Sequence, residues 1–315
     1  IIIGTHALIQ DTVEFFDLGL VIIDEQHRFG VAQRLALKNK GRDVHQLMMS
    51  ATPIPRTLAM SFFADLDVSV IDELPPGRTP IKTRLVNNVR RAEVEGFVLN
   101  ICRKGQQAYW VCPLIEESET LQLQTATETL AQLQAALPEL NIGLVHGRMK
   151  AAEKAEVMAE FAAGRLNVLV ATTVIEVGVD VPNAALMVIE HAERMGLAQL
   201  HQLRGRVGRG AAESVCVLLF AEPLSELAKA RLKVIYEHTD GFEIARQDLN
   251  IRGPGEFLGA RQSGIPMLRF ANLEEDLHLL EQAREIAPML IEQNPEIVEA
   301  HLARWLSSRE GYLGV

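Results

Sequence analysis

The chain has 315 residues, of which 48% are hydrophobic, and this length predicts two globular domains. No apolar run reaches the roughly 18 residues of a membrane-spanning helix, which excludes a membrane-embedded protein, and the three isolated cysteines argue against a zinc site or disulfide framework. The net charge of −10 does not exclude nucleic-acid binding, because residues 271–315 hold nine acids and three arginines whereas residues 204–270 hold ten basic and eight acidic residues.

Short apolar runs alternate with amphipathic segments over the first 220 residues, which is typical of parallel sheets covered by helices. Strands are expected at residues 19–24, 45–50, 68–72, 81–87, 107–112, 141–145, 167–171, 184–190 and 214–220. Helices are expected at residues 54–64, 90–104, 119–137, 150–163, 196–204, 223–238 and 241–249, before a glycine-rich loop at 251–264 and a helical tail. The sequence therefore predicts two α/β lobes, joined near Pro75-Pro76-Gly77, and a helical appendage.

The first expected strand, which contains Val21-Ile22-Ile23, leads directly into Asp24-Glu25-Gln26-His27. The carboxyl ends of parallel strands face the ligand crevice, so both acids would point at a bound substrate. A nucleotide-bound Mg²⁺ needs one carboxylate, and hydrolysis needs a second acid to orient or deprotonate the attacking water. A solvated strand end is the alternative interpretation of the same pair.

Ser50-Ala51-Thr52 also follows an apolar strand, and small hydroxyl side chains there can bridge neighbouring polar groups. The alternative is a helix cap, because Thr52 precedes Pro53 and suits a first helical turn. Both interpretations can hold together.

The stretch QLRGRVGRG at residues 202–210 places Arg204, Arg206 and Arg209 among glycines that let the backbone come close to a ligand. Forked guanidinium groups match phosphate oxygens and can stabilise charge on a transferred phosphoryl group. A basic surface turn is the alternative.

Thr172 and Thr173 stand at the end of another expected strand. Their hydroxyl and N–H groups suit a sugar-phosphate backbone, in contacts that position the protein without reading the base sequence. Gly178 and Asp180 follow in a turn that could present a carboxylate to a ribose or an arginine. An ordinary strand-to-loop transition is the alternative.

In this order, the four stretches resemble motifs II, III, V and VI of superfamily 2 helicases, and the opening IIIGTHALI resembles motif Ib. Longer stretches, DEQHRFGVAQRLAL, MSATPIPRTLAM, DELPPGRTP and GLAQLHQLRGRVGRG, are similar to those of the RecG family of bacterial branched-DNA helicases. The segment 241–264 resembles the translocation motif that RecG shares with Mfd, the transcription-repair coupling factor. The resemblance covers essentially the whole chain.

The resemblance implies two RecA-like parallel-sheet lobes, the first incomplete, followed by a helical hairpin with a translocation loop and by a helical tail. The expected boundaries are 1–78, 79–220, 221–270 and 271–315. It also implies the motor portion of an enzyme that uses ATP and Mg²⁺ to reverse stalled replication forks and migrate Holliday junctions. Such a protein is expected to be monomeric, without a membrane partner, in the bacterial cytoplasm at the nucleoid.

By the same resemblance, Asp24 would hold Mg²⁺ through water and Glu25 would activate the attacking water. Arg206 and Arg209 would reach the γ-phosphate from the second lobe. The remaining residues implied at the catalytic and nucleotide sites are His27, Gln202, Gly178 and Asp180. The residues implied in DNA binding or coupling are Gly4, Thr5, Ser50, Thr52, Thr172, Thr173, Arg246, Arg252, Arg261 and Gln262.

The family pattern has one element that this sequence lacks, the phosphate-binding loop GxxxxGK[ST]. We therefore expect that this chain is a piece of a longer protein, with that loop and a wedge domain upstream of Ile1, and that it does not hydrolyse ATP unaided.

Two other functions compete with this one. An Mfd-type translocase is disfavoured because Gln26, Val177 and Pro254 stand where that family usually carries Glu, Thr and Ala. A non-catalytic DNA-binding module is disfavoured because it would have no use for the paired acids and the arginines.

Overall fold

A computed structural model describes residues 1–25, 29, 31–50, 67, 69–71, 73, 78, 80–112, 119–172, 181–210, 213–252 and 277–306. The chain divides into two compact units, one formed by Ile1–Asp67 with Leu258–Val315 and the other by Val68–Phe257. Within the described ranges, no helix is long and apolar enough to cross a membrane.

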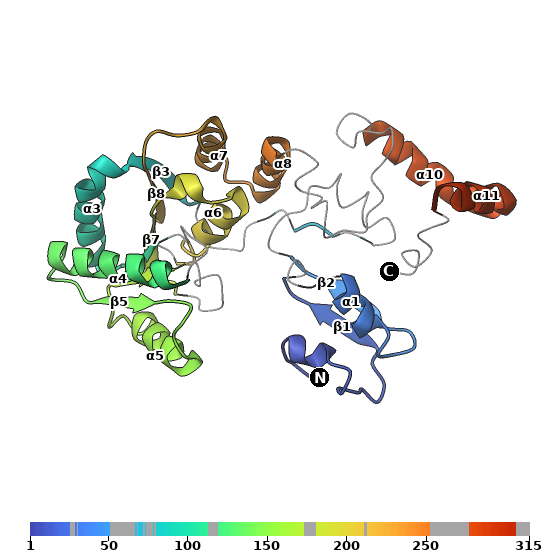
Figure 1. The fold of residues 1–315 in the computed structure, drawn as a ribbon, viewed down its shortest axis with the longest axis horizontal. Coiled ribbons are helices and arrows are strands. Elements are labelled where there is room, and N and C mark those ends of the chain that lie inside the picture. The colour runs from blue at the N-terminus through green and yellow to red at the C-terminus, as the bar shows by residue number, and fades with distance from the viewer. Residues whose placement is uncertain are drawn as a thin grey trace. The chain divides into compact units, whose positions relative to one another are not determined.

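The unit Val68–Phe257 is built on a six-stranded sheet in which every neighbouring pair is parallel (Figure 1). The strand order is β3-β8-β7-β4-β6-β5. The strands are β3 (Lys82–Asn87), β4 (Gln107–Val111), β5 (Ile142–Val145), β6 (Val168–Ala171), β7 (Ala184–Ile189) and β8 (Val215–Phe220). Parallel neighbours require crossover connections, and helices supply them, which confirms the α/β class expected from the sequence.

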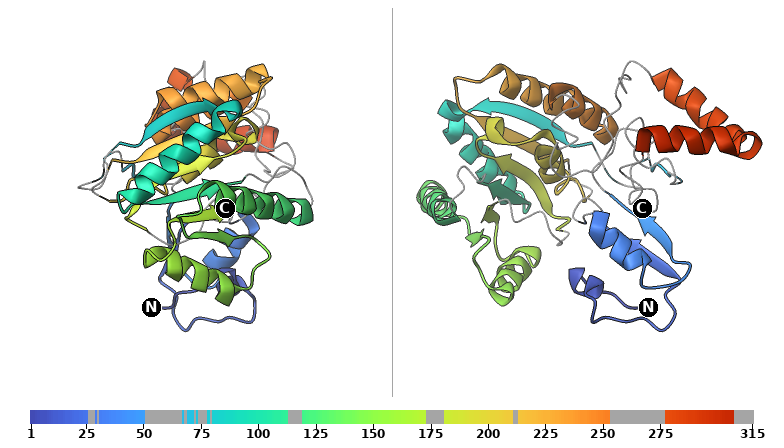
Figure 2. Two further views of the ribbon diagram at one scale, coloured as in Figure 1. Left: turned by 90° about the vertical axis from the view of Figure 1, so that its left-hand side faces the viewer. Right: turned by 45° about the vertical axis from the view of Figure 1, so that its right-hand side comes forward.

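Helices cover both faces of this sheet (Figure 2). One face packs against α3 (Arg91–Arg103) and α4 (Glu119–Ala136). The other face packs against α5 (Ala151–Ala162), α6 (Leu197–Arg204), α7 (Glu226–Glu237) and α8 (Gly241–Arg252). The two covered faces explain why the inner strands β4, β6, β7 and β8 are mostly continuous apolar runs, whereas the edge strand β3, KTRLVN, is not.

Strand β4 shows how one run serves both faces. Ala108 and Trp110 pack into the cluster beneath α3 and α4, whereas Tyr109 and Val111 pack into the cluster beneath α5, α6 and α7. All four side chains are at most 1% exposed. Successive strand residues point to opposite faces, so this central strand holds the two cores together.

The other unit contains a two-stranded parallel sheet, β1 (Leu20–Ile23) with β2 (His45–Met48), and helix α1 (Val31–Lys38). A short 3₁₀ helix, His6–Ile9, precedes them, and Lys40 Nζ donates hydrogen bonds of 2.8 and 2.7 Å to the carbonyls of Gln10 and Val13. The helical tail is confirmed as α10 (Leu277–Gln293) and α11 (Pro295–Leu306).

The described elements differ from the expected ones in two places. The strand expected at 68–72 is wrong for its described part, because residues 69–71 belong to no strand and no described strand pairs with them. Helix α1 was not expected, since its 8 residues are too short for the periodic pattern to stand out. The helix expected at 54–64 lies outside the described residues.

Candidate functional site

The acids of the first motif and the serine of the second lie at one edge of the two-stranded sheet. Asp24 follows β1, and Ser50 stands two residues after β2. Ile23 pairs with Met48, and the carbonyl of Ile23 accepts a 2.8 Å hydrogen bond from the N–H of Met49. The parallel register therefore brings these two motifs, 26 residues apart in sequence, to the same carboxyl edge.

The backbone turns sharply at this strand end. Glu25 has φ of +51°, in the left-handed region that non-glycine residues rarely adopt, and its N–H donates a 2.8 Å hydrogen bond to Asp24 Oδ1. That bond fixes the orientation of an exposed carboxylate. Strained residues of this kind concentrate at functional sites, at a cost of about 1–3 kcal/mol each.

The acids at this edge fit a nucleotide-bound Mg²⁺. In the part of the chain that the structure describes, no group of three His, Cys, Asp or Glu side chains could hold a metal ion by itself. Mg²⁺ in nucleotide sites keeps several waters and is bound through one or two carboxylates and the phosphates. An exposed and oriented Asp24 satisfies that requirement.

The six-stranded sheet brings a second set of residues to its own carboxyl edge. Thr172 follows β6 and donates its N–H to the carbonyl of Val145 at 3.2 Å, beside His146 at the end of β5. Thr172 is only 4% exposed. The neighbouring strand therefore holds its backbone, and the Thr172 N–H that was expected to contact a sugar-phosphate backbone is already used.

The sequence prediction missed the basic residues around His146. Arg148 and Lys150 are exposed just before α5, and Lys154 Nζ donates a 2.8 Å hydrogen bond to the carbonyl of Gly147. Burial, then the charge of Lys154, lowers the pKa of His146, so its imidazole is neutral at pH 7. The signal was available as a run of basic residues directly after an expected strand.

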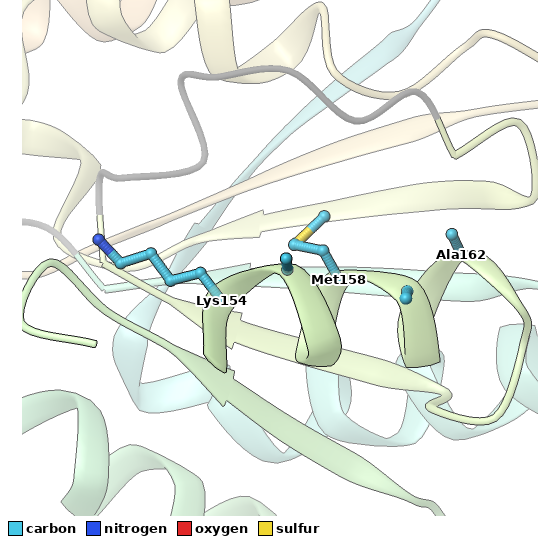
Figure 3. Close-up of a pocket in the computed structure, with 5 residues that line it drawn as sticks. Lys154, Met158 and Ala162 are labelled. Atoms are coloured by element: carbon cyan, nitrogen blue, oxygen red, sulfur yellow. The ribbon is translucent and has the colours of Figure 1, made fainter. Parts of the chain in front are cut away.

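A shallow groove runs along α5, the helix that follows these basic residues in the sequence (Figure 3). Figure 3 shows Lys154, Met158 and Ala162 projecting from the same face of the helix, and Ala155 and Ala159 complete the lining. The groove is apolar except at Lys154, so it does not suit a phosphate-bearing ligand.

The arginine-rich stretch lies at the end of α6. Gly205 caps the helix, and Val207 is fully buried in the core. A Cβ added to Gly210 would overlap the carbonyl oxygen of Pro182, so only glycine fits there. Between these fixed points, Gly208 turns the chain with φ of +80° and Arg209 is exposed to solvent.

Arg204 faces inward, contrary to the interpretation that all three arginines suit a phosphate. Its guanidinium is buried and donates hydrogen bonds of 2.8 and 2.9 Å to the carbonyls of Ile235 and His238. The inward direction of Arg204 could have been predicted from the helical spacing, because Leu197, Leu200 and Arg204 share one face of α6 and the two leucines are core residues. Arg204 therefore ties α6 to the turn between α7 and α8.

A buried ion pair at the end of β7 was also missed. Glu190 is 5% exposed and accepts a 2.9 Å hydrogen bond from Trp110 Nε1 as well as one from the Arg91 guanidinium, which stacks 5.0 Å from the Trp110 ring centroid. Burial, then the charge of Glu190, raises the pKa of Cys112 to about 12, so its thiol is not ionised. This network joins α3, strand β4 and the end of β7, and we assign it a structural role.

The other predicted site residues are spread over both units. Gly4 and Thr5 are exposed before the first 3₁₀ helix, and Gln202 is partly buried on α6. Arg246 and Arg252 lie on α8, where Arg246 forms a 2.8 Å ion pair with Glu243. His27, Thr52, Thr173, Gly178, Asp180, Arg261 and Gln262 lie outside the described residues.

Two protein-family models match the chain. Residues 93–211 match the helicase conserved C-terminal domain, which includes the sheet edge with Thr172 and the arginine-rich stretch. Residues 238–306 match the C-terminal part of domain 3 of the ATP-dependent DNA helicase RecG. These matches cover much of the larger unit and the helical tail.

Several proteins named ATP-dependent DNA helicase RecG are similar to the chain. The protein from Acidithiobacillus ferridurans is 60% identical over 99% of this chain, and that from Escherichia coli strain K12 is 58% identical over 99% of it. The protein from Bacillus subtilis strain 168 is 52% identical over 92% of the chain. The chain spans about half the length of these relatives, 46% of the first two and 43% of the third.

Among solved structures, RecG bound to a three-way DNA junction matches 89% of this chain and 36% of its own, with a TM-score of 0.67 and 52% identity. The L327V variant of S. cerevisiae Dbp5 bound to RNA and ADP BeF₃ matches 89% of the chain and 67% of its own, with a TM-score of 0.51 and 14% identity, which bears on the fold alone. The fold is thus that of helicase RecA-like domains. On its sequence and its structure, the chain belongs to the RecG family.

Proposed function

We propose that this chain is the motor portion of an ATP-dependent DNA helicase that remodels branched DNA, such as stalled replication forks and Holliday junctions. The observation that carries the proposal is the likeness, at 52% identity, to RecG bound to a three-way DNA junction. Because the relatives are bacterial proteins that are named DNA helicases, such a protein would act in the cytoplasm, at the nucleoid.

The acids after β1 would serve ATP hydrolysis. Asp24 is exposed and oriented by the N–H of Glu25, which suits a carboxylate that holds hydrated Mg²⁺. When bound, Mg²⁺ would neutralise charge on the phosphates. Glu25 follows directly and would orient the attacking water and accept its proton.

The arginines after α6 would stabilise the charge that develops on the transferred phosphoryl group. Arg209 is exposed on a segment fixed on either side by Val207 in the core and by the close packing of Gly210 on Pro182. A cation held in place before the reaction needs no reorganisation during it, and such groups contribute about 10²–10³-fold in rate. Arg206 precedes it on the same segment and would share that task.

DNA contacts would come from the carboxyl edge around Thr172. The backbone of Thr172 is held by Val145 at the end of β5, and the exposed Arg148 and Lys150 follow that strand in the sequence. Such an arrangement suits phosphates through its cationic side chains, which fix a duplex without reading its sequence, whereas the N–H of Thr172 is already donated to Val145. Roles for Gln202, Ser50 and the residues of α8 remain predictions.

The test compares Arg209→Ala in the full-length protein with Arg103→Ala, an exposed arginine of the same unit that is paired with Glu139. Arg209→Ala should reduce DNA-stimulated ATP hydrolysis and the unwinding of a three-way junction by about 10²–10³-fold. Arg103→Ala should leave both rates unchanged. Full hydrolysis by Arg209→Ala would contradict the assignment of the arginine.

A further inference from the structure

A single arginine from the stretch that joins the two expected lobes reaches the arginine-rich segment. Arg78 follows Pro75-Pro76-Gly77 in the sequence. Its Nη2 donates a 2.9 Å hydrogen bond to the carbonyl oxygen of Gly205, 127 residues further along the chain. Arg78 and Gly205 are both partly buried and both belong to the unit Val68–Phe257.

The carbonyl that Arg78 contacts lies at the end of α6. Gly205 is the cap residue of this helix, and its own N–H donates a 3.0 Å hydrogen bond to the carbonyl of His201. The last carbonyls of a helix have no donor within the helix and carry partial negative charge. The Arg78 guanidinium therefore supplies both a donor and a favourable charge to the peptide group immediately before Arg206.

Several contacts hold the course of the segment from Arg206 to Gly210, among them hydrogen bonds from the N–H of Arg206 to the carbonyl of Leu203 at 3.0 Å and from the N–H of Val207 to the carbonyl of Arg204 at 3.4 Å. Its middle is fixed by the buried Val207, and its end by the packing of Gly210 against Pro182. Its beginning is fixed by the hydrogen bond from Arg78. Unlike these two packing contacts, the one from Arg78 is a hydrogen bond donated by a charged side chain.

We propose that Arg78 is a positioning residue for ATP hydrolysis: by holding the Gly205 carbonyl it sets the direction in which Arg206 and Arg209 leave α6. This inference rests on the function proposed above for those two arginines. Because Arg78 lies in the stretch between the expected lobes, a displacement of Arg78 itself would reach the arginine segment through this hydrogen bond. A displacement of about 1 Å at a reacting group can cost about 10²-fold in rate.

The surroundings of His201 agree with this contact. Burial lowers the pKa of His201 to about 4, and the charges of Arg204 and then Arg78 add to that effect, whereas Asp240 opposes it. His201 is therefore neutral at pH 7 and does not repel the two guanidinium groups beside it. Loss of the Arg78 charge should raise the pKa of His201, which gives a readout of the contact that does not depend on activity.

The test uses the full-length protein with Arg78→Ala and Arg78→Lys, and with Arg103→Ala as the matched exposed control. At saturating three-way junction, Arg78→Ala should lower kcat for ATP hydrolysis by about 10- to 100-fold while KM for ATP changes by less than about 3-fold. Arg78→Lys should fall between the wild type and Arg78→Ala, because an ammonium can donate to the carbonyl but lacks the planar fork. A value of kcat within about 2-fold of wild type for Arg78→Ala would overturn the proposal.

A double-mutant cycle separates positioning from general stabilisation. If Arg78 acts through the arginine segment, Arg78→Ala should cause no further loss in an Arg209→Ala background. If the two substitutions lowered kcat independently, so that their effects multiplied, the proposal would be overturned. It would also be overturned if the loss of kcat in Arg78→Ala disappeared when the assay was run well below the melting temperature of that variant. Wild-type activity of Arg209→Ala would refute the proposed role of that arginine as well, whereas a loss with Arg209→Ala and none with Arg78→Ala would refute only the positioning role.

Discussion

Replacing the buried arginine at the end of α6 gives the most quantitative prediction. In Arg204→Met the side chain keeps much of its length, but it loses the donors that reach the carbonyls of Ile235 and His238 at 2.8 and 2.9 Å. A hydrogen bond with a charged partner contributes about 1.5–3 kcal/mol, so two give about 3–6 kcal/mol. Burial lowers the pKa of Arg204, which shows a desolvation cost that methionine avoids, and the expected net loss is about 2–4 kcal/mol.

Urea unfolding followed by tryptophan fluorescence measures this loss. Trp110 lies fully buried in the six-stranded sheet, and a Trp305→Phe background removes the second of the two tryptophans, so the signal reports this sheet alone. Arg103→Met is the control, because its exposed pair with Glu139 should contribute no more than about 1 kcal/mol. A loss below about 1 kcal/mol for Arg204→Met would refute the inference that this guanidinium holds α6 to the turn after α7.

Three further changes test other parts of the structure. Gly210→Ala should cost about 1–3 kcal/mol in urea unfolding, because its Cβ overlaps the carbonyl of Pro182; an unchanged midpoint would show that the two segments are not in contact. The pKa of His201 is lowered to about 4 in the folded protein, so as pH falls the unfolded state takes up the proton of this histidine first. The free energy of unfolding should therefore fall as pH drops from about 6.5 to about 4. Unfolding measured at pH 7 and pH 5 should show a smaller fall for His201→Gln than for the wild type. Glu190→Gln keeps an acceptor for Trp110 but removes the charge that faces Arg91, and a loss of about 1–3 kcal/mol in thermal unfolding is expected; equal stability would mean that the ion pair contributes nothing net.

The sheet of the larger unit could be predicted because its signal is local. The inner strands β4, β6, β7 and β8 are mostly apolar runs that polar residues end. The same logic failed at 68–72, where the apolar residues alternate as in a strand but no described strand pairs with them. Pairing depends on residues distant in sequence, which a local pattern does not contain.

The candidate site was predictable only in part, for a related reason. Strand ends mark where Asp24, Ser50 and Thr172 stand, because a parallel sheet collects such residues at one edge. Composition could not distinguish Arg204, which faces the core, from the exposed Arg209, although helical phase could have done so. The contact of Arg78 with Gly205 carries no sequence signal, since it joins segments 127 residues apart.

We infer that the acids after β1 serve ATP hydrolysis in a DNA motor. The direct measurement is ATP binding and ATP turnover by the full-length protein with Glu25→Gln, at saturating three-way junction, beside Glu14→Gln, a change at an exposed glutamate of the same unit. We predict that Glu25→Gln binds ATP with wild-type affinity but hydrolyses it about 10²–10⁴-fold more slowly, because the group that accepts the proton of the attacking water is lost, and that Glu14→Gln is unchanged in both. Turnover by Glu25→Gln at the rate of the Glu14→Gln control would contradict the claim.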